Sequence, residues 1–108
     1  MHGESRLAVY QHGVLAGTLH SVAPSGWSFA YEPEYEGPPV SLTLPVRTEA
    51  YPFPTFPPFL EGLLPEGMQL ETLLRIHKID RNDPFRQLVT VGEDVVGSLT
   101  VREIKEDA

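Results

Sequence analysis

The sequence predicts an α+β fold, in which a small antiparallel β-sheet or partial barrel is covered by two to three short helices. The first half alternates apolar and polar residues with the period of two that strands show. The second half spaces apolar residues three and four apart, as amphipathic helices do, and then closes with a strand-like run. Strands followed by helices in a chain of 108 residues indicate one domain, expected over residues 1–108.

The chain begins with a predicted β-hairpin and a third strand. Residues 7–11 and 14–20 are apolar runs on either side of a His-Gly turn, and this arrangement predicts a hairpin. Gly26–Tyr31 continues the strand period and places its aromatic residues on one face. We expect this face to enter the core through Trp27, Phe29 and Tyr31.

The middle of the chain is expected to be extended. Residues 40–45 alternate in the strand period, which predicts a fourth strand with Val40, Leu42 and Leu44 on one face. Residues 46–58 are rich in proline and aromatic residues. Proline removes a backbone donor and clashes with the preceding helical turn, so this segment is predicted to be an ordered, extended connector.

Two helices are predicted next. Residues 59–64 can form a short helix that Pro65 ends, and a longer helix is expected over residues 66–79. The longer helix carries one stripe of side chains at helical spacing, which would face the rest of the protein. The members of this stripe are Leu70, Leu73, Leu74 and His77.

A third helix and a closing strand complete the prediction. Asp83 followed by Pro84 is a helix start signal, because Asp caps the first turn and Pro fits its first position. Gly92 is expected to end this helix. Residues 95–104 are predicted as a strand.

Composition excludes several classes of function. The net charge of −7 argues against direct nucleic-acid binding, because neutralising phosphates requires surplus Lys and Arg. Without cysteine there is neither a disulfide nor a thiolate. No stretch approaches the roughly 20 apolar residues of a membrane span, and the N-terminus lacks the apolar core of a signal peptide. We therefore expect a cytoplasmic protein with no membrane partner.

The sequence offers no catalytic constellation. It has neither a phosphate-binding glycine loop nor a serine in a nucleophile elbow. Its four histidines are scattered without the spacing of metal ligands. We therefore predict that the protein is not an enzyme and that it has no catalytic residue, metal site or cofactor.

Binding is the remaining class. The run FPPFLEGLLPEG at residues 56–67 is apolar, aromatic and stiffened by proline, and exposed apolar patches mark interfaces. Alternatively, the run covers the sheet and is entirely structural. The predicted division assigns Phe56, Phe59 and Leu63 to anchoring and the segment from Leu64 to Met68 to the contact. The expected partner-binding residues are Phe56, Phe59, Leu64, Pro65, Glu66, Gly67 and Met68.

Three segments resemble the N-terminal subdomain of HipA-type serine/threonine kinase toxins. They are SLTLP at residues 41–45, FLEGLLPEG at 59–67, and FRQL at 85–88 followed by GEDVVG at 92–97. Their order and spacing match the family, and the resemblance covers nearly the whole chain. Ser98 stands where the family often has alanine. The ATP site and catalytic aspartates of these kinases have no counterpart in the 108 residues.

The resemblance implies a role in a toxin–antitoxin system. A free-standing version of this subdomain is similar to the HipS family, the small third component of HipBST systems. This implies an antitoxin that binds and neutralises a HipT-like serine/threonine kinase toxin, in a complex with a HipB-like helix-turn-helix protein. HipT-type toxins are thought to phosphorylate an aminoacyl-tRNA synthetase. Alternatives are a non-inhibitory subunit that bridges the kinase and its DNA-binding partner, and a fragment of a kinase.

Overall fold

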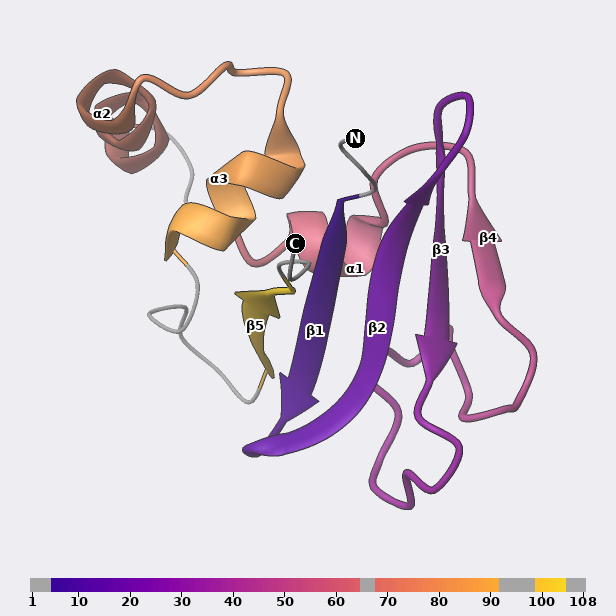
Figure 1. The fold of residues 1–108 in the computed structure, drawn as a ribbon. Coiled ribbons are helices and arrows are strands. Elements are labelled where there is room, and N and C mark those ends of the chain that lie inside the picture. Colours follow the sequence, from indigo (N-terminus) through magenta and orange to yellow (C-terminus); the bar gives the residue numbers. More distant parts are fainter. Residues whose placement is uncertain (1–4, 65–67, 92–98, 105–108) are drawn as a thin grey trace.

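The structure, a computed structural model, describes residues 5–64, 68–91 and 99–104. Within these residues the chain forms strands, then three helices, then a final strand (Figure 1). The elements are β1 (Arg6–Gln11), β2 (Val14–Val22), β3 (Gly26–Tyr31), β4 (Tyr51–Phe53), α1 (Pro58–Glu61), α2 (Met68–His77), α3 (Pro84–Val91) and β5 (Leu99–Glu103).

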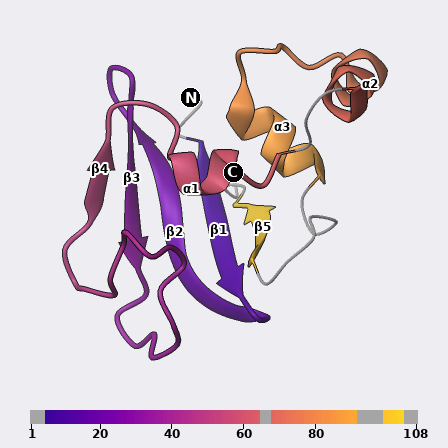
Figure 2. The ribbon, with the colours of Figure 1, turned by 180° about the vertical axis from the view of Figure 1, so that it is seen from behind.

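The strands form one antiparallel sheet in the order β4-β3-β2-β1-β5, which confirms the α+β prediction. Because β4 and β5 lie at opposite edges, the sheet is open and is not a barrel. The β1–β2 turn uses His12 and Gly13 at positive φ, 52° and 81°, as the His-Gly pair predicted. Helix α1 lies across one face of the sheet, and α2 is the element farthest from it (Figure 2).

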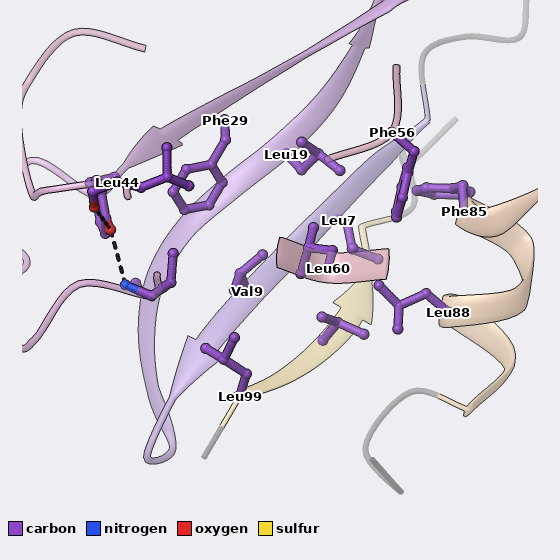
Figure 3. Close-up of a cluster of buried hydrophobic side chains, with 14 of the residues drawn as sticks. Leu7, Val9, Leu19, Phe29, Leu44, Phe56, Leu60, Phe85, Leu88 and Leu99 are labelled. Atoms are coloured by element: carbon purple, nitrogen blue, oxygen red, sulfur yellow. Dashed lines mark hydrogen bonds between the residues drawn. The ribbon is translucent and has the colours of Figure 1, made fainter. Parts of the chain in front are cut away.

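The core lies between the sheet and helices α1 and α3. Leu60 of α1 and Leu88 of α3 are both fully buried. Figure 3 shows Leu60 beside Leu7 of β1, with Leu88 next to it. Both helices are therefore held to the sheet by burial of apolar side chains, the dominant favourable term in folding.

The predicted strand at residues 40–45 is wrong. Val40 and Leu44 are buried, but Leu42 between them is fully exposed at 101%. The Leu44 N–H donates to the Ser41 carbonyl at 3.1 Å, so the segment turns back on itself. The fourth strand is instead β4, inside the predicted connector, where Phe53 pairs with Trp27 of β3.

The helices occur where the sequence placed them, with shorter bounds. Helix α1 ends at Glu61, and α2 ends at His77, followed by Lys78 at a φ of 55°. Asp83 caps α3 as predicted, because its Oδ1 accepts the Arg86 N–H at 3.0 Å. The expected helix stop at Gly92 and the first part of the closing strand, residues 95–98, lie outside the described residues.

Candidate partner-binding site

The predicted binding segment is anchored to the sheet by two aromatic rings. Phe56 is only 6% exposed, and its ring meets Trp27 edge to face at a centroid distance of 5.2 Å. Phe59 is half-buried and meets Phe29 in the same manner at 5.4 Å. Such pairs add about 0.5–1.5 kcal/mol beyond the area they bury. Phe56 thus presents little surface to a partner, whereas part of Phe59 remains exposed.

A sequence of turns carries the chain away from this anchor. The Gly62 N–H donates to the Pro58 carbonyl at 3.0 Å and ends α1. Leu63 and Leu64 then donate to the carbonyls of Leu60 and Glu61, at 3.0 and 3.1 Å. Every backbone donor from 62 to 64 is therefore satisfied, which gives the segment a defined path without regular helix.

Leu63 and Leu64 lie at the margin of the core. Both are partly buried and pack against the central cluster, and both keep some exposed surface. Leu64 is therefore placed to contact the core and a partner at once. Of the remaining predicted contact residues, Pro65, Glu66 and Gly67 lie outside the described residues, as does the side chain of Met68.

We also searched the described residues for a metal-binding cluster and for a membrane-spanning helix. None of their His, Asp and Glu side chains gather in a group of three or more that could hold a metal ion. His12 lies in the β1–β2 turn and His20 lies opposite Arg6, so the two imidazoles are at opposite ends of the hairpin. No helix among the described residues is long and apolar enough to cross a membrane.

The fold and the anchored segment define a small α+β module in which a proline-rich aromatic segment packs against the sheet. Residues 7–102 match the model of the family described as the HipA N-terminal domain. The chain belongs to this family. The resemblance inferred from three short segments is therefore confirmed over most of the sequence.

Two relatives support the assignment. A solved structure described as the N-terminal domain of HipA toxin superposes with a TM-score of 0.76 and 29% sequence identity, covering 95% of each chain. An uncharacterized protein of Haemophilus influenzae (strain ATCC 51907 / DSM 11121 / KW20 / Rd) is 32% identical over 98 residues, which are 91% of this chain and 92% of the relative. That relative is therefore itself a chain of nearly this length.

Family membership places the chain in the context of HipA-family toxin–antitoxin systems, where protein partners are expected. The matched region is the N-terminal domain, which is not the catalytic part of a HipA kinase. An accessory role in such a system therefore fits both the comparisons and the surface described above.

Proposed function

We propose that this chain is an antitoxin that binds and neutralises a HipT-like serine/threonine kinase toxin, within a complex that also contains a HipB-like DNA-binding protein. The observation that carries the proposal is the match to the HipA N-terminal domain over residues 7–102. The Haemophilus influenzae relative, which matches over 92% of its length, supports a form of this domain that is supplied to the kinase as a separate chain.

The packing of α1 supports the way in which such a protein would bind. Leu60 and Phe56 fix the base of the segment in the core, and the turns at 62–64 fix its direction. Residues 56–64 are ordered before docking, so the part of the contact that they supply loses less conformational entropy on binding. Inhibition then requires only that the docked segment block the kinase cleft or stabilise an inactive conformation.

The proposed contact is Leu64 to Met68. Glu66, between Pro65 and Gly67 in the sequence, pairs with a basic side chain of the kinase. Met68 enters an apolar pocket, for which its unbranched, adaptable side chain is well suited. Phe59 contributes its exposed part at the margin, and Phe56 supports the segment from within the core.

Co-expression with the kinase tests this proposal. We expect the wild-type chain to suppress the growth arrest caused by the kinase, and Met68→Asp and Glu66→Lys to lose most of that suppression. The matched controls are Val14→Asp and Glu49→Lys, because Val14 and Glu49 are exposed and lie outside the proposed contact. Circular dichroism checks that all four variants fold. Full suppression by the two contact variants would place the interface elsewhere.

A bridging subunit without inhibitory activity is the second candidate. It is favoured by the connection between β3 and β4, which lies at the other end of the molecule from α2 in Figure 1 and carries the fully exposed Leu42. Two separated surfaces would allow two partners to bind together. Co-expression with the kinase alone separates the candidates, because rescue without the DNA-binding protein supports the antitoxin and failure to rescue supports the bridge.

A further inference from the structure

A pocket of about 330 Å³ lies at the junction of β3, α1 and the start of α3. Three parts of the chain form it: residue 27, residues 55–61 and residues 82–85. The residues that define its character are Trp27, Phe56, Glu61, Asn82, Asp83 and Phe85. No local sequence pattern predicts this site, since its members range from residue 27 to residue 85.

Aromatic rings form one side of the pocket. Trp27 stacks on Phe85 at a centroid distance of 5.6 Å and an interplanar angle of 21°. Phe56 meets the same indole edge to face, at 5.2 Å and 90°. Trp27 is half-buried, so part of its side chain remains exposed beside these two contacts. A tryptophan face is the best aromatic partner for a cation, because its ring carries negative charge density on its faces.

Two carboxylates lie at the rim of the pocket. Glu61 and Asp83 are both exposed, and neither forms an ion pair within the described part of the chain. The arginines close to Asp83 in sequence pair with other carboxylates: Arg81 with Glu71 at 2.5 Å, and Arg86 with Glu103 at 3.3 Å. The Arg86 guanidinium carbon also lies 5.6 Å from the centroid of the Phe85 ring, where Glu103 offsets its charge. The N-terminus of α3 contributes only about half a positive charge, which the full charge of the Asp83 cap outweighs. The rim is therefore negative.

The wall on the α3 side is held in place by hydrogen bonds. The buried Gln87 side chain donates to the carbonyls of Asp80 and Arg81, both at 3.0 Å. The Asn82 N–H donates to Asp80 Oδ1 at 2.8 Å. The loop that carries Asn82 and Asp83 is therefore ordered before any ligand arrives, which lowers the entropic penalty of binding.

We propose that this pocket binds the guanidinium group of an arginine side chain on a partner protein. The planar cation would stack on Trp27 while its N–H groups donate to Glu61 and Asp83. Arginine fits better than lysine, because a guanidinium is flat, weakly hydrated and able to pair with a carboxylate through two hydrogen bonds. Glu61 ends α1 directly before the 62–64 turns, so the pocket adjoins the proposed contact.

Identifying the partner as the kinase rests on the proposed function, whereas guanidinium binding does not. The first experiment therefore uses a small probe, N-acetyl-arginine methylamide, titrated into the full chain. Trp27 is the only tryptophan, so its fluorescence and its indole N–H resonance report on binding next to this one side chain, and the variants described below show whether the probe is in this pocket. We expect a saturable change at roughly millimolar probe, as one side chain would give. The citrulline analogue, which has the same shape without charge, should produce none.

Two conservative variants test the carboxylates. Glu61→Gln and Asp83→Asn remove one charge each, and Asn keeps the cap that starts α3. We expect each to weaken probe binding several-fold and the pair to abolish it, while Glu34→Gln leaves it unchanged. Equal binding of the citrulline analogue, or unchanged binding to the double variant, would overturn the proposal.

The partner is tested separately with the purified kinase. If an arginine of the kinase occupies the pocket, Glu61→Gln should weaken the complex about as much as it weakens probe binding. Probe binding that responds to the variants, together with a kinase complex that does not, would overturn the kinase assignment and leave guanidinium binding established. A kinase that does not bind the wild-type chain would instead refute the proposed function.

Discussion

At the scale of single residues, hydrogen bonds of the Tyr31 hydroxyl hold residues 40–44 in place, where strand pairing had been predicted. This hydroxyl accepts the Val40 N–H at 3.0 Å and donates to the Leu44 carbonyl at 2.5 Å, and so clamps both ends of the turn around Leu42. Tyr35 stacks on the Tyr31 ring at 5.7 Å, and its own hydroxyl donates to the Pro38 carbonyl at 2.6 Å. The connection between β3 and β4 is thus fixed through side chains.

The Tyr31 clamp predicts a loss of stability at high pH. Burial raises the pKa of Tyr31 above its ordinary value of 10.0, and the neighbouring Tyr51 and Tyr35 raise it further, against a lowering by the Val40 hydrogen bond. The unfolded chain therefore loses this proton before the folded chain does. The contribution of Tyr31 is complete below pH 10.0 and is lost as the pH rises through the pKa of the folded state.

Denaturant unfolding of wild type and Tyr31→Phe measures this contribution. At about pH 8 the variant should be less stable by about 1–3 kcal/mol, because buried backbone groups lose their partner. Above about pH 10 the difference should shrink, since only the wild type still has the Tyr31 hydroxyl to ionise. Burial also raises the pKa of Tyr35, so some decline should persist in both proteins. Parallel pH curves for the two proteins would contradict the assignment.

Two leucines with opposite exposure give a second prediction at this scale. Leu60 is fully buried and Leu42 is fully exposed. Leu60→Ala should lower the free energy of unfolding by about 2–5 kcal/mol, because it removes apolar contacts and leaves a cavity. Leu42→Ala should change it by no more than about 0.5 kcal/mol. Thermal and denaturant unfolding of both variants supply the test, and comparable losses at the two positions would show that Leu42 packs in solution.

At the scale of elements, turn chemistry and capping were predictable and strand pairing was less so. The β1–β2 hairpin and the start of α3 were identified correctly because His12-Gly13 and Asp83-Pro84 act through local geometry. The false strand at 40–45 had the period of two, but only tertiary contacts decide which apolar residues are buried. Strand β4 was missed because of Pro52, which an edge strand tolerates.

In the candidate site, too, local features were predictable from the sequence and tertiary contacts were not. Its location after the aromatic run followed from composition, since so many apolar residues in one short segment favour an interface. That Phe56 packs on Trp27 could not be foreseen, because Trp27 comes from a strand 29 residues earlier in the sequence. For the same reason no sequence pattern predicted the pocket, which is lined by Glu61 and Asp83 together with these aromatic rings.

Helix α2 is predicted to open more easily than the β1–β2 hairpin. Leu74 is buried, but none of the described side chains of α2 belongs to the central core cluster, and Ile76 is 66% exposed. Its ion pair, Glu71 with Arg81, is solvent-exposed, and such pairs contribute only about 0–1 kcal/mol. Hydrogen–deuterium exchange should therefore be faster in residues 69–77 than in β1 and β2, where opening requires disruption of the core. Equal protection of α2 and the β1–β2 hairpin would contradict this prediction.

At the scale of the whole molecule, the acidic charge is expected to act on the rate of association. The chain carries 15 acidic and 8 basic residues, a net charge of −7. If the basic side chains proposed to meet Glu66 and the pocket belong to a basic surface of the partner, long-range attraction speeds the encounter while short-range packing determines dissociation. The charge then governs how fast the complex forms, and the anchored segment governs how long it lasts.

Surface plasmon resonance at different salt concentrations tests this separation. Raising the salt from about 50 mM to about 500 mM shortens the screening length, so the association rate constant should fall steeply while the dissociation rate constant changes little. The double variant Glu34→Lys and Glu36→Lys changes the net charge at exposed positions outside the proposed contact and should also slow association. Met68→Asp should instead speed dissociation. An association rate that is independent of salt and of Glu34 and Glu36 would exclude electrostatic steering and leave the packing of the segment as the sole determinant of binding.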